Sequence, residues 1–581
     1  MGYNSYRNNF YEWDELNFNY SKANDDEILS RAIKIGNYCA DLFYMNKFDE
    51  LFAIADRNLQ HSLYHCHGKS SLLALYALLS LERNEVDNAK EAIKKTLTFC
   101  QLKRRNNSIA ECLASFIWQT DFNLYSDYEL HAELIYAESQ TLMAMLTVFD
   151  DQHFISLIKA AFYIRAANRA YKFCYEALQN KNNWKSDEIR LEFESGVCTG
   201  HGGFNLFLSL LPEFILRLLS LAGFTGDYRK AITLLKRSTE LKQCSRYRLA
   251  ASIVKIFTLY ISRIIGHCYY DREWAFEFID ELKSKFPNAI FVLIFSATFN
   301  MREGNLDEAI EEFHKCIDLK DSWKQVHNLC RWELIWAYAI KQDWKNAAEQ
   351  AKLLFEHCTY SPASNAYQFA VFRMLQMETE GNDKLKEEIN EAMKLTPKLV
   401  KRYAGFLLPP EEFSVWCADR YLVKGLKPII ALLSLFYAWN VFALINDRET
   451  IEIFLKRTNE TLKVIENCDS NEKDYDEIAS LLLVKGVLLR NAKEYEEAIS
   501  CLKRVIEMKD SLVTHTFLPP HAALEAGITY FDMGNYNESR KWLCTAKSIV
   551  KSFRYEIVVH ARVHAFMKKI NEFESSSEVL A

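Results

Sequence analysis

The chain has 581 residues, of which 49% are hydrophobic and 14% aromatic, and its formal net charge is −6 at pH 7. This composition supplies enough apolar surface for a large buried core and excludes disorder on a large scale. It also provides no overall basic field for binding nucleic-acid phosphates, so nucleic acid is not an expected partner.

The few prolines and glycines and the spacing of the cysteines indicate a helical protein with reduced thiols, located in the cytoplasm. Only 9 prolines and 17 glycines interrupt the sequence, and alternating runs of β-branched residues are scarce, which favours long helices joined by short turns. The 15 cysteines show no C-x-x-C spacing, as is typical of core thiols. The N-terminus carries acids and asparagines where a signal peptide needs an apolar run, which favours the cytoplasm.

In chain order, the hydrophobic pattern divides the sequence into six segments. Residues 1–27 have no period and are expected to form a loosely ordered N-terminal tail. Helical hairpins follow, the first pairing a helix that ends near Met45 with one from Phe48, and the second pairing Ser71–Leu81 with Val86–Cys100. The remaining predicted segments are N-terminal hairpins (28–190), a central glycine-rich block with tetratricopeptide-like repeats (191–360), long apolar helices (361–470), C-terminal tetratricopeptide repeats (471–570) and a tail (571–581).

The stretch from Glu192 to Asp227 is the most unusual in the chain. Four glycines fall between Gly196 and Gly203, yet the apolar residues around them keep helical spacing. We therefore expect two helices that meet at very close range. Glycine at 196, 200 and 203 recurs at i, i+4 and i+7, which predicts a stripe without side chains along one side of the helix, where a neighbouring backbone approaches closely. Pro212 is expected to start or kink the next helix.

A repeated helix-pair unit is the strongest structural signal. In one copy, Ala297 is expected where two helices cross, Gly304 ends the first helix, and Ala309 lies on the inner face of the second. Two later copies repeat the phase of small residues. This spacing predicts an all-α fold, a tetratricopeptide-like superhelix of antiparallel helix pairs, with the corresponding signature residues Gly486, Ala498, Gly527, Gly534 and Ala546.

The charge-free run Pro428–Asn446 has a borderline length for crossing a bilayer. Ser434, Tyr437 and Asn440 interrupt its apolar surface, which favours a helix buried inside the helical array. A spanning helix is the alternative.

The whole chain resembles the tetratricopeptide repeat protein 39 family, which includes the fungal inclusion-body clearance proteins. The most diagnostic match is the glycine block, FESGVCTGHGGFNLFLSLLP from Phe193. The resemblance implies a non-enzymatic helical scaffold, with members associated with lipid and sterol homeostasis, cilium assembly, or the clearance of aggregates alongside lipid droplets. Other matching motifs begin at His61, His131, Trp323 and Leu518.

No complete catalytic, cofactor or metal motif is found, so none of these sites is predicted. Gly68-Lys69-Ser70 ends like a phosphate-binding loop but lacks the first glycine and a preceding strand. The histidine cluster His61, His65 and His67 lacks a nearby acid or thiol to complete a tetrahedral zinc site. His131-Ala132-Glu133 lacks the P-C-x-x-C partner of zinc deaminases. Helix packing and capping are the favoured roles of these histidines.

Two functional hypotheses follow. The first is a scaffold that binds other proteins, with an apolar groove that either accepts a helix or is filled by the chain itself, because the predicted groove positions contain no lysine or arginine. The second is a lipid- or sterol-responsive binder with an apolar pocket between helices, and the aromatic residues Trp323, Trp332, Trp336 and Trp344 are its candidate cage. Peripheral association with membranes or lipid droplets is a possible accompaniment. The groove positions are Phe291, Ile294, Phe295, Thr298, Ser480, Leu483, Val484, Val487, His521, Leu524, Glu525 and Ile528.

Overall fold

Helices dominate the fold of this protein, for which the structure is a computed structural model. It describes residues 18–105, 120–150, 155–210, 226–261, 263, 272–319, 324–403, 406–468 and 473–580. Nearly every element in these ranges is a helix, so the predicted all-α class is confirmed. The exception is a hairpin of two-residue strands, β1 (Arg402–Tyr403) and β2 (Phe406–Leu407), which pair antiparallel.

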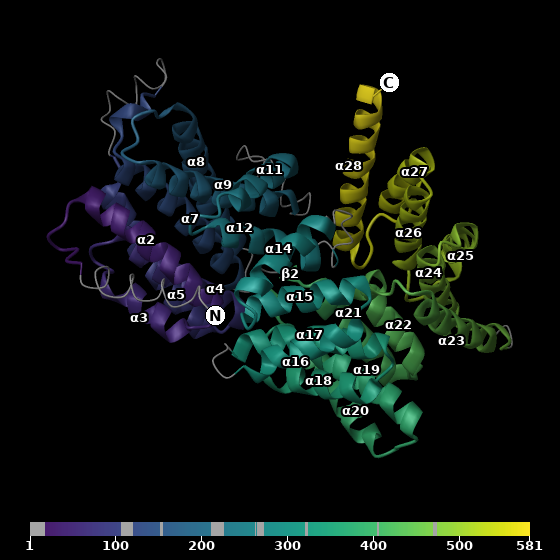
Figure 1. Cartoon of the computed structure of the whole chain (residues 1–581). Coiled ribbons are helices and arrows are strands. Elements are labelled where there is room, and N and C mark those ends of the chain that lie inside the picture. The colour runs from purple at the N-terminus through teal and green to yellow at the C-terminus, as the bar shows by residue number, and fades with distance from the viewer. Residues whose placement is uncertain are drawn as a thin grey trace.

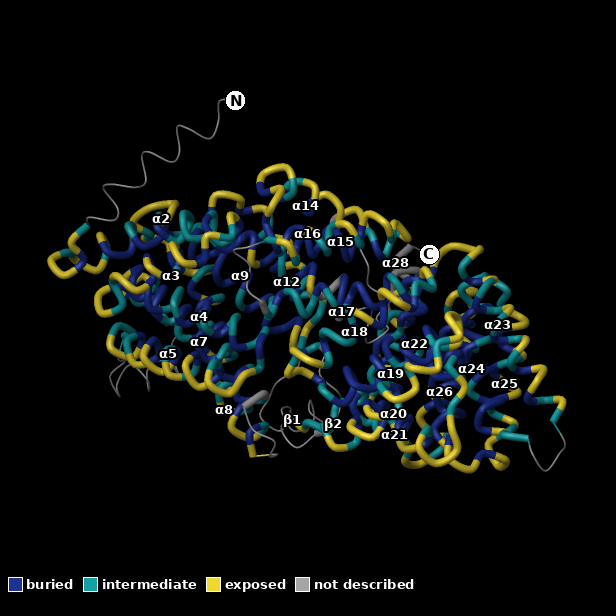
Figure 2. Tube along the Cα trace, turned by 90° about the horizontal axis from the view of Figure 1, so that it is seen from below, coloured by how far each residue is buried: buried dark blue, intermediate teal, exposed yellow. Residues whose placement is uncertain are grey.

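The helices follow one another as packed pairs, from α2 at one end of the molecule to α25 at the other (Figure 2). Both hairpins expected near the N-terminus are present, although the first helix of the second pair begins at Leu63 rather than Ser71. The N-terminal helices are α2 (Asp25–Tyr44), α3 (Phe48–Arg57), α4 (Leu63–Ser80), α5 (Arg83–Lys103), α7 (Asp127–Asp150), α8 (Ile155–Asn180), α9 (Asp187–Leu210), α11 (Tyr228–Glu240) and α12 (Tyr247–Lys255), with a 3-10 turn at Phe122–Leu124 and a π-helical turn at Ile256–Ile261.

The described part of the chain begins at Phe18, within the predicted N-terminal tail. Tyr20 is buried, with its ring 5.2 Å from that of His65. Asn24 then caps α2, because its side chain accepts from the amide of Glu27 while the Glu27 carboxylate accepts from the amide of Asn24. The division into six segments stays a prediction, because packed helices alone do not mark domain boundaries.

The middle of the chain forms the largest core cluster, which extends from α15 to α26. In Figure 1 these helices are stacked below the N-terminal set. They are α14 (Arg272–Lys285), α15 (Ile290–Glu303), α16 (Leu306–Asp318), α17 (Lys324–Ile340), α18 (Trp344–His357), α19 (Pro362–Glu380), α20 (Leu385–Leu395), α21 (Pro409–Lys424) and α22 (Pro428–Ala438), with 3-10 turns at Thr396–Lys398 and Val441–Leu444.

The apolar run from Pro428 is buried, as predicted, but it is not one helix. α22 has only 11 residues and ends at Ala438, because Asn440 adopts a left-handed conformation with φ of 50°. The Asn440 side chain donates to the carbonyl of Arg263 over 2.6 Å, which fixes this break. No helix in the described ranges is both long and apolar enough to cross a membrane.

The C-terminal helices form the regular repeats. A loop, called here the inserted loop, lies between the repeat that contains Gly486 and the repeat that contains Gly527. It ends at Leu518, and Pro519 and Pro520 occupy the first turn of the helix that follows. These helices are α23 (Arg448–Glu466), α24 (Tyr475–Asn491), α25 (Tyr495–Glu507), α26 (Leu518–Asp532), α27 (Tyr536–Ser548) and α28 (Glu556–Leu580), with a 3-10 turn at Met508–Ser511.

Candidate functional site

The glycine block lies within one continuous helix, α9, and its glycines face different neighbours. A Cβ built at Gly196 would lie 2.5 Å from Leu134 of α7, and one at Gly200 would lie 2.5 Å from Tyr171 of α8. Gly203 faces Ile253 of α12 at 3.3 Å. The stripe therefore accepts side chains from three helices, not one backbone, and the second expected helix, from Pro212, lies outside the described residues.

A neighbouring backbone does approach the block at Gly202, which the sequence analysis did not single out. A Cβ there would lie 3.1 Å from the carbonyl oxygen of Ala231 and 2.9 Å from Leu235, both in α11. Only glycine leaves room for this crossing. α9 is therefore a central helix, and α7, α8, α11 and α12 all pack against it.

The repeat-signature glycines within helices lie at crossings inside helix pairs. A Cβ at Gly486 of α24 would lie 2.7 Å from Leu502 of α25, and one at Gly527 of α26 would lie 2.9 Å from Leu543 of α27. The signature glycines at helix ends have left-handed backbones, with φ of 87° at Gly304 and 76° at Gly534. The signature alanines are fully buried: Ala297, Ala309, Ala498 and Ala546.

The inner face of the C-terminal pairs is covered by the chain itself. α22 packs on α24, and the predicted groove residues Leu483, Val484 and Val487 are buried in the same cluster as the apolar side chains of α22. Tyr437 of α22 reaches α26, where its hydroxyl lies 3.0 Å from Nδ1 of His521 and 3.1 Å from Oε1 of Glu525. Of the two predicted alternatives, the described structure therefore shows a groove filled by its own helices.

The carboxylate of Glu525 gathers basic side chains at this groove. It accepts from Nη1 of Arg490 in α24, and from Nη1 of Arg562 in α28 over 2.6 Å. Burial alone would raise the pKa of Glu525, but Arg562 and Arg490 lower that pKa to about 2. Two cations therefore do reach the groove, Arg490 from α24 and Arg562 from α28, although the predicted groove positions contained none, and both are paired with Glu525.

The same cluster fixes the tautomer of His521. The Tyr437 hydroxyl donates its one hydrogen to the ionised Glu525, so its oxygen accepts from Nδ1–H of His521. Burial lowers the pKa of His521 to about 3, so the ring is neutral at pH 7. Its Nε2 carries a lone pair and has no hydrogen-bond partner among the described residues.

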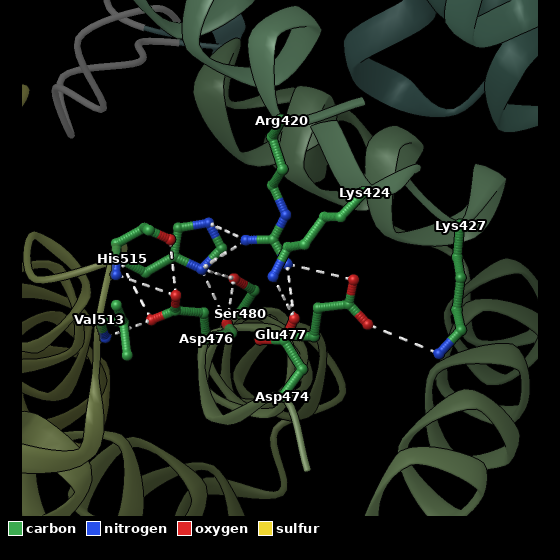
Figure 3. Close-up of polar contacts among 10 residues, drawn as sticks. Arg420, Lys424, Lys427, Asp474, Asp476, Glu477, Ser480, Val513 and His515 are labelled. Atoms are coloured by element: carbon green, nitrogen blue, oxygen red, sulfur yellow. Dashed lines mark hydrogen bonds and ion pairs between the residues drawn. The ribbon is translucent and has the colours of Figure 1, made fainter. Parts of the chain in front are cut away.

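A second polar network holds the inserted loop against α24 (Figure 3). Asp476 accepts from the backbone amides of Val513, Thr514 and His515 at 2.9–3.1 Å. Arg420 of α21 donates to Nε2 of His515 over 2.8 Å, while Nδ1 of that ring donates to the carbonyl of Asp476. These contacts place the loop at the edge of the groove.

Arg420 also ties α21 to the start of α24. Its Nη2 lies 3.2 Å from Asp474 and 3.1 Å from Glu477, and Lys424 and Lys427 add further ion pairs to these acids. Burial, and next Arg420, lower the pKa of His515 to about 4, so this ring too is neutral at pH 7. Salt bridges and a neutral histidine thus clamp α21, α24 and the loop into one unit.

A small cavity of about 70 Å³ remains where these elements meet. It lies between α21, α22, α24, α26 and α28, and its wall combines aromatic rings with the His521 and Arg562 side chains. Ligand sites for drug-sized molecules occupy about 300–1,000 Å³. This cavity therefore has room for one small side chain or a few waters, and not for a sterol.

Known family models match most of the chain, including α21, α22 and α24 of this groove, whereas α26 and α28 lie beyond the matched residues. The model of the Iml2/Tetratricopeptide repeat protein 39 family matches residues 37–492. The chain belongs to this family. A general tetratricopeptide repeat model also matches residues 479–511, which correspond to α24, α25 and the turn after them.

One named relative agrees with the Iml2/Tetratricopeptide repeat protein 39 assignment. The chain is 29% identical to "Tetratricopeptide repeat protein ttc-39B" of Caenorhabditis elegans over 562 residues, which are 94% of this chain and 95% of that protein. Yeast Tom70 is 13% identical, with a TM-score of 0.25 over 96% of this chain and 99% of that one. The Cut9–Hcn1 structure is 12% identical, with a TM-score of 0.25 over 93% and 96%.

The histidine cluster of this family member is divided among packing contacts. His65 is buried, Cys66 lies 3.2 Å from the hydroxyl of Thr96, and His67 lies 3.1 Å from Glu138. His131 is buried and contacts the Tyr64 hydroxyl and a backbone carbonyl. In the part of the chain that the structure describes, no group of three or more potential ligands could hold a metal ion.

The predicted aromatic cage is packed core. The rings of Trp332 and Trp336 are 5.8 Å apart in an edge-to-face contact, and Trp336 is fully buried. Trp344 is buried in the same cluster, and Trp323 lies outside the described residues. These interlocking rings belong to the largest core cluster, and they line neither the small cavity at the groove nor a larger hollow beside α8.

Proposed function

We propose that this member of the Iml2/Tetratricopeptide repeat protein 39 family is a non-enzymatic scaffold that binds partner proteins at the small cavity which its own helices leave at the inner face of the C-terminal repeats. The family match and the helix pairs α24–α25 and α26–α27 support an interaction role. The observation that carries the location is the cavity at the groove, which adjoins the unpartnered Nε2 of His521.

A partner polypeptide fits this site better than a small molecule does. The cavity of about 70 Å³ accepts one apolar side chain, and Nε2 of His521 accepts a hydrogen bond from an N–H or O–H donor on the same segment. Peptides commonly anchor to repeat grooves by such a combination of an apolar side chain and a polar contact. The family resemblance extends this proposal to cytoplasmic assemblies that serve lipid homeostasis, cilium assembly or inclusion-body clearance.

The sterol-binding alternative receives no comparable support. A hollow of about 360 Å³ beside α8 is lined by Arg104, Arg105, Arg169, Glu129 and Glu133 together with five aromatic or aliphatic residues, so five charged side chains would face an apolar ligand there. We therefore propose only the scaffold.

The test is quantitative affinity capture with the full-length protein and a variant that fills the cavity. Val558 lines the cavity from α28 and is partly exposed, so Val558→Arg should abolish the recovery of groove-bound partners. Val464→Arg is the matched control, because Val464 is 63% exposed on α23, away from the groove. Equal recovery with both variants, at unchanged thermal stability, would refute the groove as the docking site, and the absence of any reproducible partner would refute the scaffold.

A further inference from the structure

The outward face of α8 combines exposed apolar side chains with cations. Ile155, Ile158 and Phe162 are 53%, 48% and 67% exposed. Large apolar side chains this exposed are unusual three in a row along one helix, and their spacing of three and four residues puts them on one side. This face therefore carries an apolar ridge over the first two turns of the helix.

Basic side chains continue the same face. Lys159 lies beside the apolar ridge, and Arg165, Arg169 and Lys172 follow it, all exposed. At 100° per residue, the seven positions fall within an arc of about 140°, over a length of about 26 Å. Along this arc the first acidic residue is Glu176, at the far end.

The four cations are not committed elsewhere in the described structure. None of them has an ion pair or hydrogen bond with another described residue. Arg169 lines the 360 Å³ hollow, where the two acids are already engaged. Glu133 binds Arg104, and Glu129 accepts from the amide of Ser126 over 2.8 Å. Within the described residues, the positive charge of the α8 face is therefore not neutralised by an acidic partner.

The shape of this face limits what covers it. α8 packs on α7 and α9 on its inner side, and in Figure 1 it lies at the edge of the molecule. Arg169 borders the 360 Å³ hollow, whereas Ile155, Ile158, Lys159 and Phe162 do not line it, so the N-terminal half of α8 can lie along a flat surface. Apolar side chains together with basic ones are the two signals that hold a helix at an anionic lipid interface.

We propose that the outer face of α8 binds the surface of anionic lipid membranes. Ile155, Ile158 and Phe162 enter the headgroup region, and Lys159, Arg165, Arg169 and Lys172 contact the lipid phosphates and carboxylates. The contact is peripheral. It does not depend on the protein partners proposed above, so either proposal can fail alone.

The experiment is co-sedimentation of the full-length protein with vesicles of phosphatidylcholine alone and of phosphatidylcholine mixed with phosphatidylserine. We expect binding to the mixed vesicles that weakens with added salt, and little binding to the neutral ones. A basic residue at an anionic surface contributes about 1 kcal/mol, so Arg165→Glu, Arg169→Glu and Lys172→Glu together should weaken binding by about 100-fold or more.

Two further variants separate the apolar contribution from nonspecific charge. Ile158→Ser with Phe162→Ser should weaken binding to the mixed vesicles while leaving its salt dependence unchanged. The control reverses the same number of exposed lysines elsewhere, Lys94→Glu, Lys345→Glu and Lys456→Glu, and should bind like the wild type. All changed side chains are exposed, and urea unfolding verifies that each variant is folded.

Three outcomes would overturn the proposal. One is equal binding of the wild type to both kinds of vesicle, or to neither. Another is an equal loss with the control triple variant, which would make net charge the cause. The third is that the wild-type protein does not bind vesicles but binds polyglutamate through the same face, which would make an acidic protein the partner.

Discussion

Gly200 of α9 lies directly against the ring of Tyr171 of α8. A Cβ at position 200 would come within 2.5 Å of Cε1 and 2.8 Å of the hydroxyl oxygen of Tyr171. Tyr171 cannot retreat easily, because it is buried and stacks on His201 with ring centroids 5.9 Å apart. The central helix α9 thus packs closely against its neighbours because its glycines have no Cβ atom.

The first prediction concerns this contact. Gly200→Ala should destabilise the protein by about 1–2 kcal/mol, because overpacking costs about 1–3 kcal/mol and exceeds the gain of up to about 1 kcal/mol in helix propensity. Gly68→Ala in α4 is the control, since nothing lies within 4 Å of a Cβ there, and it should be neutral or stabilising. Urea unfolding measures both, and a stabilised Gly200→Ala variant would contradict the contact.

The second prediction tests the crossing of α24 and α25 with a double-mutant cycle. Gly486→Ala should destabilise the protein, because the new Cβ would lie 2.7 Å from Cγ of Leu502. Leu502→Ala alone should cost about 2–5 kcal/mol through the cavity it leaves. The double variant should be less destabilised than the sum of the two, since the added methyl group enters space that Leu502 vacates. Strict additivity would show that the two positions do not meet.

The third prediction concerns the buried carboxylate at the groove. Glu525→Gln should destabilise the fold by about 3–5 kcal/mol, because it leaves Arg562 buried without its anionic partner and Arg490 with only Asp532, at 3.7 Å. Glu91→Gln is the control, since the ion pair of Glu91 with Lys95 is exposed, and its urea midpoint should not change. A Glu525→Gln variant as stable as the control would mean that water reaches the two guanidinium groups.

The fourth prediction concerns pH. Burial lowers the pKa of His65 and His515 to about 4, and that of His131 and His521 to about 3, whereas in the unfolded chain each has its ordinary value near 6.5. Below that value the unfolded chain binds more protons than the folded one, so the free energy of unfolding falls as the pH falls below about 6.5. Below about 4.5 Glu525 adds to this fall, because its carboxylate takes up a proton in the unfolded chain while its folded pKa is only about 2.

Urea unfolding at neutral and mildly acidic pH measures this dependence. His521→Gln should reduce the difference in stability between the two conditions, because one proton-binding site of the unfolded chain is removed. His357→Gln, at an exposed position in the last turn of α18, should leave the difference close to that of the wild type. A stability that does not change between neutral and mildly acidic pH would contradict the buried neutral state of these rings.

The sequence alone determined the fold class and the positions of the repeats. Gly486, Gly527 and the buried alanines recur in phase with helices, and that phase depends only on local spacing, so it can be read without a structure. It also indicated the burial of the Pro428 run, although not the break at Asn440, which a tertiary hydrogen bond to the carbonyl of Arg263 fixes.

Only the tertiary structure decided what each residue faces. The stripe of Gly196, Gly200 and Gly203 contacts three different helices, and the groove near Glu525 receives Arg562 from a helix that the repeat pattern does not pair with it. Periodicity gives the direction of a side chain around its own helix axis, but it contains no information about which distant segment lies there. The filled groove and the uncommitted cations of α8 follow from how the helices assemble.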